Sequence, residues 1–177
     1  MVDNKLELKI AIDSFKSATD NFIQSLSFST PELFENQIEN KGLEISGVYY
    51  IEIRSEKFLR ERQADWKRQF ISFWDKTEFH ATFTPKSKKK RLDAHKSMRE
   101  WTPLYIGKSE NIKKRLNDHK TLRLDQRTRG LKLDARGVYE HDCFRVSHIE
   151  ISMDIYNYIS ATVENHFRNT INPLVGI

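Results

Sequence analysis

The sequence predicts an α+β fold, because strand-like stretches alternate with amphipathic helical stretches along the chain. Residues 45–54, 103–107 and 144–151 carry the β-branched, aromatic and aliphatic residues that strands favour. Apolar residues at helical spacing occupy much of the remainder. A chain of 177 residues can bury a core without disulfides or metals, so we expect one domain over residues 1–177.

Composition limits the classes of partner and site. The formal net charge of +5 favours an acidic partner, nucleic acid first. The single cysteine, Cys143, excludes an intramolecular disulfide and a Cys-rich zinc site. We see neither a secretory leader pattern nor an apolar run of membrane-spanning length. We therefore expect a soluble, cytoplasmic protein of prokaryotic or phage origin, with no membrane partner.

Two helices are predicted before the first strand. Apolar residues recur at helical intervals over residues 5–26. A second helix is expected to about Asn40, with Thr30 as its cap and Pro31 at its first position. The charge of this helical N-terminal extension, residues 1–43, is mixed rather than basic. We interpret the extension as a packing layer or a dimerisation element.

The first strand, residues 45–54, alternates between two faces. Val48 and Tyr50 share one face, and Tyr49 lies on the other. Adjacent tyrosines in a strand are usually core residues. After this strand an aromatic-rich helix is expected over residues 56–78, and its ordinary explanation is also the core.

A basic run follows a short extended piece, residues 79–83. It holds five cations in six residues: Lys86, Lys88, Lys89, Lys90 and Arg91. The preceding Pro85 predicts an exposed loop, whose cations are either solvated or in contact with phosphates. A short helix over residues 92–100 is expected to lead into the second strand.

The second strand passes through Gly107 into a basic helix. Leu104 and Ile106 alternate with Tyr105, so Tyr105 is expected to face away from both. Ser109 or Asn111 can cap the helix. Within it Arg115 and His119 are four residues apart and share one face. The ordinary explanation is a strand–helix corner with solvated cations.

The C-terminal part holds a basic segment, a strand and a long helix. Residues 122–140 are irregular, with Arg127 and Arg129 as candidate DNA contacts. The third strand, 144–151, precedes a helix from Asp154 to Asn172, where Pro173 ends it. Glu164 borders the apolar stripe of this helix. A carboxylate there needs solvent, an arginine or a bound cation.

Together these residues resemble the GIY-YIG nuclease superfamily. Gly47-Val48-Tyr49 matches the first triad with Val in place of Ile, and Tyr105-Ile106-Gly107 matches the second. The ten-residue step from Tyr105 to Arg115 and the position of Glu164 before Pro173 also fit the family pattern. The resemblance covers residues 44–177, interrupted by an insertion over residues 55–102.

The resemblance implies a small three-stranded central β-sheet flanked by helices, and cleavage of DNA phosphodiesters with one divalent metal, Mg²⁺ or Mn²⁺, per active site. Glu164 would be the sole protein ligand of that metal. Tyr49 and Tyr105 would meet at the site on neighbouring strands, and one of the two, with Tyr49 favoured over Tyr105, would position or deprotonate the attacking water. Arg115 would neutralise charge on the scissile phosphate. Gly47 and Gly107 would be structural.

Two further side chains are implied to tune the tyrosines. Lys108 would lower the pKa of a phenol or contact the phosphate. His119 is similar to a histidine of restriction-endonuclease members that contacts the catalytic tyrosine. Because the pKa of free tyrosine is about 10, a tyrosine that acts as a base near neutrality needs cationic neighbours. We expect Lys108, Arg115, His119 and the metal to supply that charge.

Several features separate this chain from the family pattern. The two triads are usually joined by a short turn, whereas Tyr49 and Tyr105 are 56 residues apart. Gly176 stands where members often have an asparagine, and Asn172 is the candidate substitute for it. We see no room for a separate DNA-recognition domain. These features favour a restriction-type endonuclease that reads double-stranded DNA as a homodimer.

Two other interpretations remain open. One is a structure-selective or repair-type nuclease with the same chemistry and no sequence specificity. The other is a non-catalytic DNA-binding module on the same fold.

Overall fold

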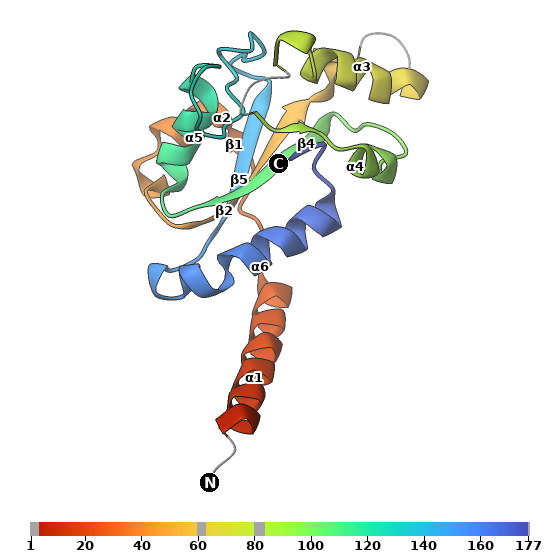
Figure 1. The fold of residues 1–177 in the computed structure, drawn as a ribbon. Coiled ribbons are helices and arrows are strands. Elements are labelled where there is room, and N and C mark those ends of the chain that lie inside the picture. The colour runs from red at the N-terminus through yellow and green to blue at the C-terminus, as the bar shows by residue number, and fades with distance from the viewer. Residues whose placement is uncertain (1–3, 60–62, 80–83, 177) are drawn as a thin grey trace.

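The computed structural model describes residues 4–59, 63–79 and 84–176, and its centre is a four-stranded antiparallel sheet (Figure 1). The strand order is β1-β5-β2-β4. The strands are β1 (Glu32–Leu33), β5 (Phe144–Glu150), β2 (Gly47–Arg54) and β4 (Trp101–Ser109). The prediction of a mixed α and β fold is confirmed. The prediction of a three-stranded sheet is wrong, because the short strand β1 adds a fourth strand.

Strand β1 arises where the sequence predicted the start of a helix. Glu32 pairs with Val146 and Leu33 pairs with Arg145, so the chain after Pro31 extends the sheet beyond β5. The helix α2 (Phe34–Glu39) begins only afterwards. Thr30 therefore does not cap it, because backbone pairing to β5 takes the place of the first helical turn.

The two triad strands are neighbours in spite of the insertion between them. Strand β2 pairs antiparallel with β4, with Tyr49 opposite Gly107 and Ile51 opposite Tyr105. The register shifts between Ile51 and Glu52, so β4 contains a bulge at Leu104. Leu104 and Tyr105 consequently belong to one hydrophobic cluster, while Ile106 belongs to the other. The predicted alternation through Leu104 is wrong because of this bulge.

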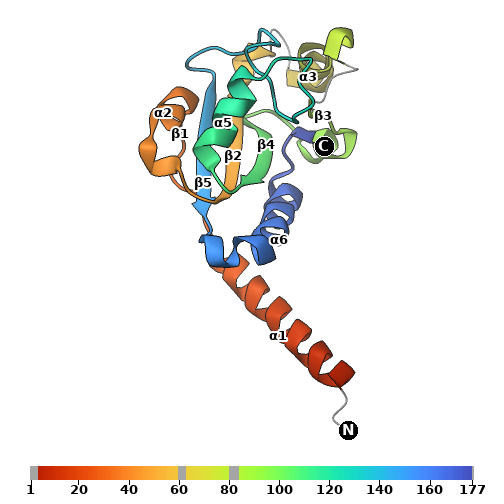
Figure 2. The same cartoon turned by 60° about the vertical axis from the view of Figure 1, so that its left-hand side comes forward.

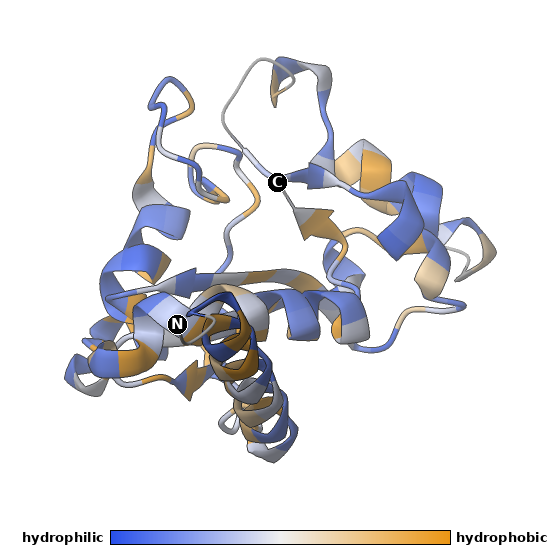
Figure 3. Cartoon of the chain, turned by 60° about the horizontal axis from the view of Figure 1, so that its bottom comes forward, coloured by the Kyte–Doolittle hydropathy of each residue, from blue (hydrophilic) through white to orange (hydrophobic). Residues whose placement is uncertain are grey.

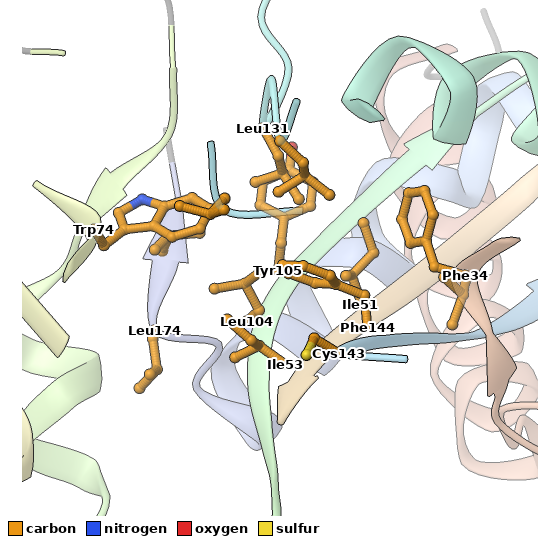
Figure 4. Packing of buried hydrophobic residues seen from close by; sticks show 14 of the residues in the cluster. Phe34, Ile51, Ile53, Trp74, Leu104, Tyr105, Leu131, Cys143, Phe144 and Leu174 are labelled. Carbon is orange, nitrogen blue, oxygen red and sulfur yellow. The ribbon is translucent and has the colours of Figure 1, made fainter. Parts of the chain in front are cut away.

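Each face of the sheet has its own core. One cluster contains Tyr49, Ile51 and Tyr105 with residues from α2, α3, α5 and the segment after α5, and Figure 4 shows part of it. The other cluster contains Val48, Ile106 and apolar residues of α6. The helices concerned are α3 (Trp66–Trp74), α5 (Ile112–Thr121) and α6 (Met153–Ile171). The central strand β2 is therefore covered on both sides, which is why all but two of its residues are buried.

Helix α1 (Asn4–Ser25) leaves the body of the domain. Figures 1 and 2 both show it leading away from α6, with the N-terminus at its far end. Only Thr19 and Ile23 of this helix are buried. No helix in the described part of the chain is long and apolar enough to cross a membrane.

The insertion folds into short elements and docks on the C-terminus. Besides α3, the insertion contains the strand β3 (Lys86–Ser87) and the helix α4 (Lys89–Ala94). It also contains three 3₁₀ turns: η2 (Ser55–Lys57), η3 (Gln63–Asp65) and η4 (Thr77–Phe79). Strand β3 pairs with β6 (Val175–Gly176) in a second, two-stranded sheet. The basic run thus begins in a strand and a helix instead of an exposed loop.

The helix boundaries of the insertion also differ from the prediction. The predicted helix over 56–78 reduces to α3 and flanking 3₁₀ turns, and residues 60–62 within it lie outside the described residues, as do 80–83 of the extended piece. The helix expected over 92–100 corresponds to α4, which starts earlier and ends at Ala94. Backbone pairing of β3 with β6 fixes where that helix can begin.

Arg136 fastens the irregular segment after α5 to the insertion. Its side chain donates to the Trp74 carbonyl at 2.7 Å and to Thr84 Oγ1 at 3.0 Å. The guanidinium also lies over the Trp74 ring, 4.3 Å from its centroid. Burial lowers the pKa of Arg136 to about 10. The basic segment 122–140 therefore contains a structural arginine as well as exposed ones.

Candidate active site

The centre of the site is the pair of triad tyrosines with His119. Tyr49 Oη lies 2.7 Å from His119 Nε2. The ring centroids of Tyr49 and Tyr105 are 6.2 Å apart, and the His119 ring is 5.2 Å from that of Tyr105. Tyr49 is 1% exposed and His119 is fully buried. The structure thus brings together three residues from β2, β4 and α5.

Hydrogen bonding determines which nitrogen of His119 carries the proton. The backbone N–H of Leu131 donates to His119 Nδ1 at 2.9 Å, so Nδ1 is an acceptor. Burial, with Arg115 nearby, lowers the pKa of His119 well below its usual value. The ring is therefore neutral, its proton is on Nε2, and it donates to the Tyr49 oxygen. His119 cannot supply the positive charge that the sequence suggested, because its surroundings keep it uncharged.

At the two motif glycines, neighbouring atoms lie so close to the backbone that a side chain would collide with them. A Cβ on Gly107 would lie 2.4 Å from Tyr49 Oη and 2.8 Å from Tyr105 Cε1. A Cβ on Gly47 would lie 2.0 Å from the carbonyl oxygen of Ile149 on β5. Gly107 therefore makes room for the tyrosine pair, and Gly47 lets β2 lie close against β5.

Arg115 lies beside both phenols. It is positioned by α5, which Asn111 caps by accepting from the Lys114 N–H at 2.8 Å. The guanidinium donates to the Arg129 carbonyl and lies 3.8 Å from Asp118. Its side chain is 19% exposed. Arg115 thus keeps a partly accessible cation next to the tyrosines.

The pKa values of the tyrosines are raised in this environment. Burial raises the pKa of Tyr49 well above its usual value, and the neighbouring Tyr105 adds to the effect, while Arg115 lowers it. The pKa of Tyr105 is also raised by burial, again with Arg115 opposing and Glu164 adding. Both phenols are protonated in the free protein.

Glu164 reaches the site from α6. Its side chain is 15% exposed and its nearest ion-pair partner is Arg168 at 3.4 Å. Burial raises the pKa of Glu164, and Arg168, Lys108 and Arg91 oppose the rise. Because Glu164 also raises the pKa of Tyr49 and Tyr105, its carboxylate is electrostatically coupled to the tyrosine pair.

Arg91 of the insertion lies in the same neighbourhood. Its Nη1 donates to the carbonyls of Pro173 at 3.4 Å and Val175 at 3.1 Å. A Cβ on Gly176 would lie 2.6 Å from Arg91 Nη1 and 3.3 Å from Arg168 Nη2. The absence of a side chain at Gly176 therefore leaves room for two arginines beside Glu164.

The other predicted site residues are spread over the surface around this centre. Lys108 is exposed, with Nζ 5.4 Å from the centroid of the Tyr156 ring. Lys86 is partly buried and donates to the Phe79 carbonyl, and Lys88 precedes α4 as its cap residue. The remaining predicted DNA contacts are exposed: Lys89, Lys90, Arg127 and Arg129.

The sequence pattern did not place three of the participants at this centre. The Leu131 N–H that orients His119 lies in an irregular segment, and the arginine that pairs with Glu164, Arg168, was not identified. Arg91 was assigned to a DNA-contacting loop. Its pairing with the C-terminal strand follows from the contact of β3 with β6, for which two-residue strands give no periodic pattern.

Comparison with known families agrees with this geometry. The family model of the GIY-YIG catalytic domain matches residues 100–175. The match supports a nuclease of that superfamily. No curated protein and no solved structure matched the chain significantly. The matched region starts at β4, so the first triad lies outside it and is joined to it by the pairing of Tyr49 with Gly107.

The residues around Glu164 fit a hard divalent cation. Mg²⁺ keeps several waters and is commonly held by one or two carboxylates plus substrate phosphate oxygens. Glu164 offers one largely buried carboxylate, whose Oε1 lies 3.4 Å from Arg168 Nη1. Among the described residues, the one group of three or more potential metal ligands is Glu140, Asp142 and Cys143, outside this site. A single-carboxylate metal site is therefore what Glu164 can provide.

Proposed function

We propose that the chain is a metal-dependent endonuclease that hydrolyses phosphodiester bonds of double-stranded DNA, with the sequence specificity of a restriction-type enzyme. The observation that carries the proposal is the Tyr49–His119 hydrogen bond, set between Tyr105 and Arg115 and within electrostatic reach of Glu164. A core tyrosine needs a hydrogen-bond partner, but it does not need an arginine and a largely buried carboxylate within electrostatic reach.

Tyr49 is the residue that takes the proton from the attacking water. His119 donates to the phenol oxygen and cannot accept its proton, because Nδ1 is already an acceptor and Nε2 is already protonated. That donation stabilises the phenolate, as Arg115 does by its charge. Because Tyr49 is protonated in the free protein, its phenol must first release that proton to solvent. The phenolate then accepts a proton from the water that attacks phosphorus, and the bond from phosphorus to the leaving-group oxygen breaks.

Arg115 and Glu164 have separate roles at the phosphate and at the metal. Arg115 neutralises charge that develops on the phosphate, and its 19% exposed side chain is accessible for this contact. Glu164 holds the divalent cation, Mg²⁺ or Mn²⁺. The bound cation supplies Lewis-acid stabilisation of the phosphate oxygens. Lys108 and Arg91 lower the pKa of Glu164 and so favour its ionised form.

Cleavage of a mixed-sequence plasmid with Mg²⁺ tests the proposal. Glu164→Gln and Arg115→Ala are each expected to reduce the cleavage rate by about 10²-fold or more, the usual range for loss of an electrostatic contact in the transition state. Glu140→Gln is the matched control, because Glu140 is exposed and lies outside the site. Discrete bands that vanish in both site variants support the restriction-type enzyme.

Other outcomes decide between the remaining functions. A smear of products that depends on Glu164 indicates a nuclease without sequence specificity, of the repair or structure-selective class. DNA binding without cleavage under either metal would overturn the enzyme and leave a binding module.

The insertion is proposed to grip the DNA backbone. Lys89 and Lys90 are exposed on α4, and Arg91 of the same helix lies near the candidate active site. Phosphates bound by the two lysines would therefore lie close to that site. Reversing the charge of Lys88, Lys89 and Lys90 is expected to weaken DNA binding and to lower the salt slope of log K by about 0.9 for each lost phosphate contact. The control reverses the three lysines of α1, namely Lys5, Lys9 and Lys16. Equal affinity of the α4 variant and the wild type would sink this role.

A restriction-type enzyme that reads a palindromic site needs two copies of the chain. We include a homodimer in the proposal for two reasons. Each chain would provide one active site, and each half of a palindromic DNA sequence is read by one subunit.

A further inference from the structure

Helix α1 exposes large apolar side chains in the part that extends beyond the domain. Leu8 is 61% exposed, Ile12 44% and Phe15 49%. The helix has 22 residues, and most of the stability of helices in proteins comes from packing of their apolar face. Figure 3 shows hydrophobic residues along this helix, which begins at the N label. A protruding helix with such side chains needs a partner surface.

The exposed residues continue a stripe that is already used for packing. Leu8, Ile12 and Phe15 are spaced four and three residues apart, and the same spacing continues through Thr19, Phe22 and Leu26. Toward the C-terminal end of α1 the stripe packs on α6: Phe22 and Leu26 lie against the cluster that contains Ile159. The stripe is therefore one face, covered at one end and open at the other.

Helix α6 extends this open face. Tyr158 is 72% exposed and Ile155 is 36% exposed. Together with Phe15, Ala18 and Phe22 they line an apolar groove between the two helices. We call Leu8, Ile12, Phe15, Ile155 and Tyr158 the α1–α6 face.

The charges of α1 argue for one kind of occupant. The helix carries Lys5, Lys9 and Lys16 against Glu7, Asp13 and Asp20, so it has no net charge within a chain of net charge +5. It therefore offers no electrostatic attraction to DNA or to an anionic membrane surface. A second copy of the same helix brings equal numbers of both signs, and the spacing of the stripe is that of paired helices.

We propose that the α1–α6 face is the homodimer interface of this protein, with α1 of each copy covering the stripe of the other about a two-fold axis. A two-fold interface uses the same patch on both subunits, so the open stripe of one copy and the apolar groove of the other are both occupied. The interface deepens the homodimer included in the proposed function. It does not depend on cleavage, because it can be measured without DNA.

The mass of the full chain in solution tests the interface. Sedimentation equilibrium at micromolar concentration, without DNA or metal, is expected to give twice the 21.0 kDa of one chain. The double variant Leu8→Asn/Ile12→Asn is expected to sediment as a monomer. Its matched control is Leu6→Asn/Ile10→Asn, which changes the same residue types on the same helix. Leu6 and Ile10 are 55% and 60% exposed and lie on the opposite face.

Each result has a defined meaning. Both double variants lower the helix propensity equally, so circular dichroism should show the same small loss for both. A monomeric wild type, or equal masses of the two variants, would overturn the interface. A monomeric wild type that co-sediments with phosphatidylserine vesicles would overturn it in favour of a membrane surface. Loss of cleavage with an unchanged dimer would count against the nuclease and leave the interface intact.

Discussion

At the scale of single residues, the site is organised by hydrogen bonds that fix a proton. His119 accepts from Leu131 N–H and donates to Tyr49, so its two nitrogens have opposite roles. The sequence pattern places Tyr49 and His119 in one site but does not show which of them can give up a proton, and this arrangement does. In the proposed mechanism Tyr49 exchanges a proton with the attacking water, whereas His119 donates to the phenol oxygen and keeps its own proton.

The buried, neutral His119 predicts a specific pH dependence of stability. Its pKa in the folded protein is below the unfolded value of about 6.5, so the unfolded chain binds a proton more readily as the pH falls. Stability is fully present above pH ~6.5 and falls by about 1.4 kcal/mol per pH unit below it. His119→Gln, which does not titrate, is expected to lose this part of the dependence.

Urea unfolding at a series of pH values between ~5 and ~8 checks the prediction. His148 also has a lowered pKa because of burial, and it contributes equally to both proteins. The difference between the two profiles therefore reports on His119 alone. Parallel profiles of the wild type and His119→Gln would contradict the neutral ring.

Most of the candidate site could be predicted from the sequence, because its residues have local signatures. Tyr49 and Tyr105 lie in apolar strands, Arg115 and His119 share a helical face, and Glu164 borders an apolar stripe. The state of His119 could not be predicted, because it depends on Leu131, which an irregular loop brings to the ring. No sequence pattern reveals which backbone group of an irregular loop forms a hydrogen bond with a titratable side chain.

At the scale of elements, the insertion is held by contacts that have no periodic pattern. The sequence predicted an insertion with a basic run, and it predicted that the two triad strands are neighbours. It did not predict the pairing of β3 with β6, because each of these strands has only two residues. The short strand β1 was missed for the same reason: Thr30 and Pro31 resemble a helix start, and pairing to β5 outweighs that local preference.

Arg136 is expected to be the main link between the insertion and the segment after α5. Arg136→Met removes two hydrogen bonds of a charged group and leaves the buried Trp74 carbonyl without its donor. The expected loss of unfolding free energy is about 2–4 kcal/mol. Arg123→Met is the control in the same segment, because the Arg123 side chain is 76% exposed, and it should change stability by less than ~0.5 kcal/mol.

Urea unfolding of the two variants against the wild type gives the measurement. An Arg136→Met protein as stable as the wild type would mean that desolvation of the guanidinium cancels its hydrogen bonds. The insertion would then be held by other contacts, chiefly the pairing of β3 with β6.

At the scale of the whole molecule, the number of strands cut per encounter depends on the number of subunits. In the proposed nuclease each chain provides one active site, with one Glu164 and one Arg115, so one chain would cut one strand per encounter. In a dimer the second site is held near the second strand, and the second cut is a local event instead of a new encounter. Wild-type protein is therefore expected to convert supercoiled plasmid to the linear form without accumulation of nicked circles.

The Leu8→Asn/Ile12→Asn variant separates the two cuts. Its catalytic residues are unchanged, so the first nick should form, but linear product should appear on the order of 10²-fold more slowly because the second cut has lost its effective concentration. The Leu6→Asn/Ile10→Asn control should follow the wild type. Agarose-gel time courses of the three plasmid forms measure both steps. Linearisation by the Leu8→Asn/Ile12→Asn variant at the wild-type rate would show that α1 does not couple the two active sites, whatever the mass of the protein in solution.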